Sequence, residues 1–145
     1  MSNSIRQEVN IEASPKRIYD ALLDAKRFSA FTGAPAEIDP KSGGAFSCFG
    51  GVIIGRNIEL LPDQRIVQAW RVAVWPDGLY SIVKFELQPQ GSETRLVLDH
   101  VGFPEEMRAH LNGEEADGGW HRRYWEPLKK YLAQQDDGIT ATSRR

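Results

Sequence analysis

The chain has 145 residues, of which 41% are hydrophobic and 26% charged, and its formal net charge is −2. These values are typical of one globular domain, and the near-neutral charge disfavours binding to nucleic acid or to an anionic membrane. No apolar run approaches the roughly 20 residues that span a bilayer. Residues 1–14 lack the apolar segment of a secretory signal, and the single cysteine cannot form an internal disulfide. We therefore expect a cytoplasmic protein without a membrane anchor.

The first third of the chain predicts one strand followed by two short helices. Residues 4–13 alternate apolar and polar side chains, as a half-buried strand does. Ser14 is a favourable N-cap for a helix over residues 14–25, and a second helical piece over residues 26–33 ends at Gly33. Together with the strands that follow, this order indicates an α+β fold.

The middle of the chain predicts an antiparallel meander. Short β-like stretches alternate with breaks rich in glycine and proline, which is typical of successive hairpins. The stretches are residues 36–40, 44–51, 52–62, 65–76, 79–89 and 94–103, and a short helix is expected over residues 103–112. With the first strand, the sheet should have about six to seven strands.

Residues 118–133, "GGWHRRYWEPLKKYLA", predict a long amphipathic helix. At about 100° per residue, the aromatic and leucine side chains fall on one side and the basic ones on the other. Pro127 lies inside this pattern and removes a backbone hydrogen bond, so we expect a kink or a widened turn there. Asn112 or Asp117 could cap the start of the helix.

This helix is the element long enough to cover one face of the twisted sheet. The strand residues assigned to that face include Val72, Val74 and a mixture of larger apolar and polar side chains, a composition that suits a small-molecule cavity. It is equally that of an ordinary core, because interiors of this size pack densely. The residues expected to line a cavity are Gln68, Trp70, Val83, Phe85, Leu96, Leu98, His100, Trp120, Tyr124 and Leu128.

Candidate catalytic groups are few. His100 could act as a base in the cavity, but it cannot pair with the adjacent Asp99, because neighbours in a strand point to opposite faces. Cys48 is expected to be a buried, unreactive thiol, and the exposed pair Glu37 and Asp39 is expected to lie at an edge. The histidines lack zinc-ligand spacing and the glycine pairs lack a phosphate-binding pattern, so neither a metal nor a cofactor is predicted.

Several stretches together resemble a known family. Residues 28–71, 75–87, 91–104 and 119–132 resemble, in this order, the carboxy-terminal domain of the activators of heat-shock-protein-90 ATPase, and "GWHRRYWEPLKKYL" is the most specific of the four. That domain belongs to the START-like (SRPBCC, helix-grip) superfamily. The resemblance implies a curved antiparallel sheet around a long C-terminal helix. It also implies the chaperone-stimulating role of the eukaryotic members, which carry a further domain ahead of this one.

Three functions follow from these observations. The first is a non-catalytic module that binds a small hydrophobic or amphipathic ligand between the sheet and the last helix. The second is a co-chaperone that stimulates the ATPase of heat-shock protein 90 in the stress response, and the third is a cyclase-like enzyme using the same cavity. We expect one START-like domain over residues 1–135, a flexible polar tail over residues 136–145, and leave the oligomeric state open.

Overall fold

The computed structural model describes residues 4–111 and 119–140. Seven strands form one antiparallel sheet, which agrees with the number expected from the sequence. They are β1 (Ser4–Ile11), β2 (Ala36–Ile38), β3 (Ala45–Cys48), β4 (Ile53–Leu61), β5 (Arg65–Val72), β6 (Ser81–Gln90) and β7 (Glu93–Val101).

The sheet is an open meander, and the first strand is added to it at one edge, beside β7. Strands β2 to β7 follow each other in space as they do in sequence, and β1 pairs with β7, giving the order β1-β7-β6-β5-β4-β3-β2. β1 and β2 are therefore the two edges. Successive hairpins need only short turns, which is why glycine and proline separate the strands in the sequence.

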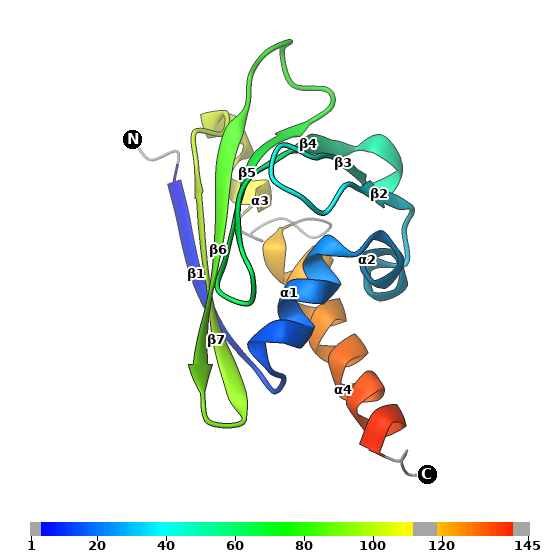
Figure 1. Ribbon diagram of the computed structural model, residues 1–145. Coiled ribbons are helices and arrows are strands. Elements are labelled where there is room, and N and C mark those ends of the chain that lie inside the picture. Colours follow the sequence, from blue (N-terminus) through cyan, green and yellow to red (C-terminus); the bar gives the residue numbers. More distant parts are fainter. Residues whose placement is uncertain (1–3, 112–118, 141–145) are drawn as a thin grey trace.

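Two short helices follow β1 and lie on the same side of the sheet as the last helix (Figure 1). They are α1 (Pro15–Leu23) and α2 (Ala25–Thr32). As predicted, the Ser14 hydroxyl accepts a hydrogen bond from the backbone N–H of Arg17, and α2 ends at Gly33, whose φ of 74° is in the left-handed region. The expected helix after β7 is a 3-10 turn over Glu105–Met107 that continues into α3 (Arg108–Leu111).

The last helix begins with a π-helical turn over His121–Trp125 and continues as α4 (Glu126–Thr140). In the π-helical turn the backbone N–H of Glu126 donates to the carbonyl of His121, five residues back. Pro127 follows directly, so the prediction of a widened turn at this proline is confirmed. The capping residues Asn112 and Asp117 lie outside the described residues. The helix continues to Thr140, five residues into the segment expected to form the tail.

The last helix lies on one side of the sheet (Figure 1), which confirms the predicted α+β arrangement of sheet and helix. At its start, the Trp120 ring packs on Trp70 of β5 and Phe85 of β6. Trp120, Tyr124, Trp125, Leu128 and Leu132 are all buried. The basic and acidic side chains of the opposite side, Arg122, Arg123, Glu126, Lys129 and Lys130, are exposed. No helix of the described residues is long and apolar enough to cross a membrane.

One predicted inward-facing residue is not buried. Val74 was expected on the covered face of the sheet, but its exposed fraction is 89%. β5 ends at Val72, and the chain then turns, since the N–H of Trp75 donates to the carbonyl of Val72. The period-two pattern therefore stops two residues before Val74, and the prediction for this residue was wrong.

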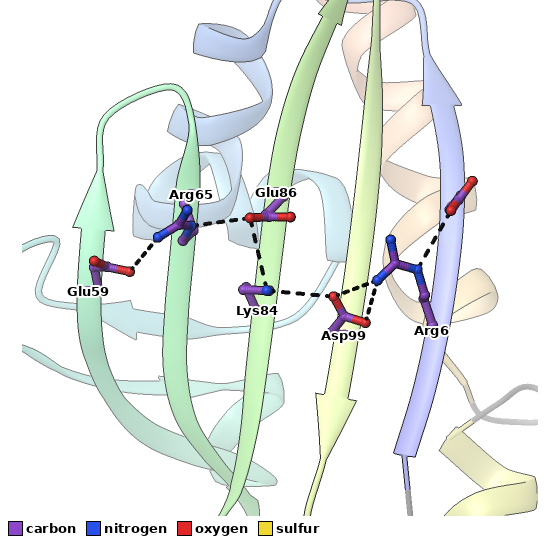
Figure 2. A network of polar contacts seen from close by, with 7 residues as sticks. Arg6, Glu59, Arg65, Lys84, Glu86 and Asp99 are labelled. Carbon is purple, nitrogen blue, oxygen red and sulfur yellow. Dashed lines mark hydrogen bonds and ion pairs between the residues drawn. The ribbon is translucent and has the colours of Figure 1, made fainter.

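The other face of the sheet carries a chain of ion pairs, shown in Figure 2, whose members come from five strands. Cationic and anionic side chains alternate along it, with N–O distances between 3.2 and 4.0 Å. From β4 to β1 its members are Glu59, Arg65, Glu86, Lys84, Asp99, Arg6 and Glu8. Asp99 belongs to this outer chain while the adjacent His100 is buried, which confirms that the two side chains point to opposite faces.

Candidate functional site

A cavity of about 370 Å³ lies between one end of the sheet and the start of the last helix. Its walls come from the ends of β4 and β5, the turn after β3, the short helical segment before Leu111, and the π-helical turn. Leu111 and Gly119, on either side of the undescribed segment 112–118, both line it. The lining residues are Ala34, Phe49, Val52, Ile53, Trp70, Val72, Met107, Leu111, Gly119, Trp120, Arg123 and Tyr124.

Aromatic side chains form a continuous wall of this cavity. The ring centroids of Trp70 and Trp120 are 5.5 Å apart, and those of Trp120 and Tyr124 are 4.5 Å apart. Phe49 completes the wall, with its ring 6.0 Å from that of Tyr124. Such contacts fix the ring positions, because aromatic pairs at these separations stabilise one another beyond their buried area. The wall is therefore preformed and apolar.

Three of the predicted site residues, Trp70, Trp120 and Tyr124, line this cavity. Two others, Gln68 and Phe85, line with Tyr124 a much smaller void of about 10 Å³. The remaining five belong to the packed core and line neither space among the described residues: Val83, Leu96, Leu98, His100 and Leu128. The aromatic rings of the last helix cover the middle of the sheet. The cavity therefore lies nearer the end of the sheet than predicted.

His100 is held in a buried chain of hydrogen bonds. The indole N–H of Trp120 donates to its Nδ1 at 3.3 Å, and its Nε2 lies 2.8 Å from the hydroxyl of Ser81. That hydroxyl donates to the carbonyl of Trp70. Because an indole N–H can only donate, Nδ1 accepts and the imidazole proton resides on Nε2. Burial lowers the pKa of His100 to about 3, so the ring is neutral at physiological pH.

These contacts place His100 poorly for base catalysis. A general base needs a nitrogen within hydrogen-bonding reach of the substrate. Both ring nitrogens of His100 face protein groups, and the ring is not part of the cavity wall. The geometry therefore assigns His100 to the support of Trp120 and Trp70, which do line the cavity.

Gln68 has a similar structural role. Its amide nitrogen donates to the side-chain oxygen of Asn57 at 3.1 Å, and the amide nitrogen of Asn57 donates to the carbonyl of Asp39 at 3.0 Å. Both amides are buried. These hydrogen bonds connect β5 and β4 to the β2–β3 loop. They also give both buried amides a partner, as is usual for buried polar groups.

The described lining of the cavity is mostly apolar. Arg123, at the exposed side of the helix, is the charged residue among its described lining residues. Burial raises the pKa of the Tyr124 hydroxyl, and the nearby indole N–H of Trp70 offsets part of this rise. That N–H nevertheless reaches hydrogen-bond geometry with no group in residues 4–111 or 119–140.

Cys48 has no chemical role at this site. The side chain is buried beside Phe46 and Tyr124, and burial raises the pKa of the thiol to about 12. A thiol in this environment is protonated at neutral pH and is a poor nucleophile. The part of the chain that the structure describes contains no group of three histidine, cysteine or carboxylate side chains arranged to hold a metal ion.

Most of the cavity-lining residues were missed by sequence reasoning. They lie in loops or at element ends, where the alternation of a strand gives no information. Phe49 is the clearest case, because its backbone φ of 55° is unusual for a residue other than glycine and turns its ring towards Phe28 and Tyr124. The available sequence signal was a bulky phenylalanine placed directly before a pair of glycines, Gly50 and Gly51.

Sequence comparison relates this fold to one protein family. Residues 12–133 match the family profile described as Activator of Hsp90 ATPase homolog 1-like protein. The human Activator of 90 kDa heat shock protein ATPase homolog 1 is 31% identical over 119 residues, which are 81% of this chain and 33% of the human protein. The homologue from Dictyostelium discoideum is 28% identical over 129 residues, 88% of this chain and 32% of that protein. The chain thus spans about a third of the length of these relatives.

Solved structures show the same fold. An HSP90 activator from Plasmodium falciparum superposes with a TM-score of 0.69 at 25% identity, covering 97% of each chain. The Aha1 dimer from Colwellia psychrerythraea gives a TM-score of 0.74 at 20% identity, covering 91% of this chain and 96% of that one. The second likeness is evidence for the START-like fold alone.

Proposed function

The chain belongs to the family of Activator of Hsp90 ATPase homolog 1-like proteins, and we propose that it is a binding module of that family. Its ligand is a small apolar or amphipathic molecule held between the sheet and the start of the last helix. The cavity of about 370 Å³ carries this proposal. Ligand sites in proteins are typically of this size, largely apolar, and supplied with a few polar groups.

The packing around the cavity supports binding rather than catalysis. The four aromatic residues Phe49, Trp70, Trp120 and Tyr124 give the cavity flat walls suited to ring-shaped or acyl groups. The buried histidine behind the wall is neutral and bonded through both nitrogens. The site therefore offers shape and apolar surface, and its described titratable groups are not arranged for proton transfer.

Thermal unfolding in the presence of a panel of apolar and aromatic compounds tests the proposal. A ligand that binds the folded state raises Tm, by an amount that grows with its concentration relative to Kd. Ala34 lines the cavity, so Ala34→Phe should fill it and abolish the rise. Ala133 is exposed on α4, so Ala133→Phe is the matched control and should keep the rise. A panel without any effect on the natural protein would contradict the proposal.

A second candidate is stimulation of the Hsp90 ATPase. It is favoured by the family match and by the exposed cations of the last helix, Lys129 and Lys130 among them, which could meet an acidic chaperone surface. The test is ATP turnover by the Hsp90 of the same organism with increasing amounts of this protein. Stimulation should fall in the Lys129→Glu/Lys130→Glu variant and persist in Ala34→Phe, and unchanged turnover at saturating protein would exclude this function.

A further inference from the structure

The cavity extends from the buried core to the surface of the protein. Two of its lining residues, Trp120 and Tyr124, have exposed fractions of 2% and 4%, whereas Val52, which also lines it, has an exposed fraction of 53%. Arg123 is another exposed lining residue. Its positive charge is therefore placed where the cavity meets solvent, while the aromatic rings form the inner wall.

Arg123 brings one positive charge to the described wall, which contains no acidic residue. The other eleven described lining residues are uncharged. Glu106, beside the lining residue Met107, and Glu126, three residues after Arg123, are exposed and do not line the cavity. The described wall thus favours an anionic group over a cationic one at its exposed end, because unlike charges attract.

The start of the last helix determines which arginine borders the cavity. The backbone N–H of Arg123 donates to the carbonyl of Gly119 at 3.1 Å, and both residues line the cavity. The adjacent Arg122 is also exposed, but it lines a separate groove between α2 and α4, together with Phe31 and Pro127. Two neighbouring arginines therefore border two different hollows, and of the two it is Arg123 that lines the cavity.

An arginine at this place suits a carboxylate. The planar guanidinium presents parallel N–H groups that match the two oxygens of a carboxylate. It has five N–H donors, so it can bind a ligand carboxylate while it keeps contacts within the protein. A ligand with an apolar body and one anionic end would thus bind in a single orientation, with the anionic end towards solvent.

We propose that the ligand is an amphipathic carboxylate, whose apolar body lies against the aromatic wall and whose anionic group pairs with Arg123 where the cavity meets solvent. This inference rests on the proposed binding function and specifies its ligand class and orientation. An exposed ion pair contributes little to affinity, so the apolar contacts supply most of it. Arg123 then selects among ligands that share the same apolar body.

The experiment compares two probes with the same chain length, decanoate and decanol, by calorimetric titration at neutral pH, where decanoate is ionised. Arg123→Gln removes the charge that borders the cavity. Arg122→Gln removes an equal charge from the adjacent position outside the cavity and is the matched control. The readout is the Kd of decanol divided by that of decanoate, because a general loss of packing weakens both probes alike. Far-UV circular dichroism verifies that each variant is folded.

We expect this ratio to fall about three- to fivefold in Arg123→Gln and to stay unchanged in Arg122→Gln. Both probes should bind much more weakly to Ala34→Phe, whose new side chain fills the cavity. An unchanged ratio in Arg123→Gln, or an equal fall in both arginine variants, would overturn the inference while the binding function stands. If members of the apolar panel bind but neither probe does, the ligand class is wrong; if nothing binds, the binding function fails and the inference with it.

Discussion

The indole nitrogen of Trp120 lies 3.3 Å from Nδ1 of His100, so the start of the last helix is bonded to the end of β7. This contact needs a neutral imidazole, because a protonated ring has no acceptor nitrogen. The helix is thereby attached to the sheet through a group whose charge state depends on pH.

Stability should decrease as pH falls below about 6.5, with His100 as a main cause. Burial lowers the pKa of His100 in the folded protein to about 3. Between this value and the ordinary pKa, the unfolded chain binds more protons than the folded one, so the free energy of unfolding rises with pH. From pH 7 to pH 5 the loss attributable to His100 should be about 2 kcal/mol.

Urea unfolding at these two pH values measures the effect, and His100→Gln is the control. Glutamine keeps polar atoms near Ser81 and Trp120 but does not titrate, so the variant should be less stable at pH 7 and should lose less on acidification. The only other described histidine side chain, that of His121, is exposed and present in both proteins, so the comparison subtracts its contribution. An equal pH dependence in the two proteins would show that His100 is not the titrating group.

Trp120 should be among the residues on which the fold depends most. It is buried between Trp70, Phe85 and Tyr124. Trp120→Ala should lower the free energy of unfolding by about 3–5 kcal/mol, as removal of a large buried aromatic side chain does. Lys129→Ala, on the exposed side of the same helix, should change it by no more than about 0.5 kcal/mol. Guanidinium denaturation compares the two; similar losses would mean that the helix does not pack on the sheet as described.

The sequence was sufficient for the fold where a period determines which side chains are buried. The strand alternation that places Val83, Phe85 and Leu87 on one face is visible without a structure, and all three are buried. The same holds for Tyr124, Leu128 and Leu132 on the last helix. Even the widened turn follows from Pro127, because a missing N–H has the same consequence in any helix.

The position of the cavity could not be obtained in this way. It depends on how far the rings of Trp120 and Tyr124 extend across the sheet and on the turn that brings Phe49 to them, which are matters of packing between distant segments. Period-two reasoning treats all inward positions of a strand as equal. It therefore selected Leu96 and Leu98, at the packed centre, and missed Ile53 near the end of the sheet. Met107 was missed for another reason, because it lies in a 3-10 turn outside any strand pattern.

Cys48 should be unreactive in the folded protein. Its thiol is buried and its pKa is raised to about 12, so both access and the thiolate fraction are low. In the folded protein, alkylation of Cys48 by iodoacetamide at pH 8 should be at least about a hundredfold slower than in denaturant, where the chain is unfolded and the thiol is accessible. Cys48 is the chain's single cysteine, so mass spectrometry reads the rate directly. Fast alkylation of the folded protein would contradict the burial of β3 against the core.

The ion pairs of the outer face should contribute modestly and depend on salt. Arg6 Nη1 lies 3.2 Å from Asp99 Oδ1, and the side chains keep 59% and 26% of their exposure. Pairs as accessible as this contribute about 0.2–1 kcal/mol. A double-mutant cycle with Arg6→Ala and Asp99→Ala should give a coupling energy in this range at about 0.1 M salt and a smaller one at about 1 M salt. The control cycle combines Arg6→Ala with Lys41→Ala. Lys41 lies in the β2–β3 loop beside the opposite edge strand, so this cycle should give no coupling energy. A coupling that does not decrease with salt would mean that Arg6 and Asp99 stabilise the sheet by packing or by geometry rather than by charge.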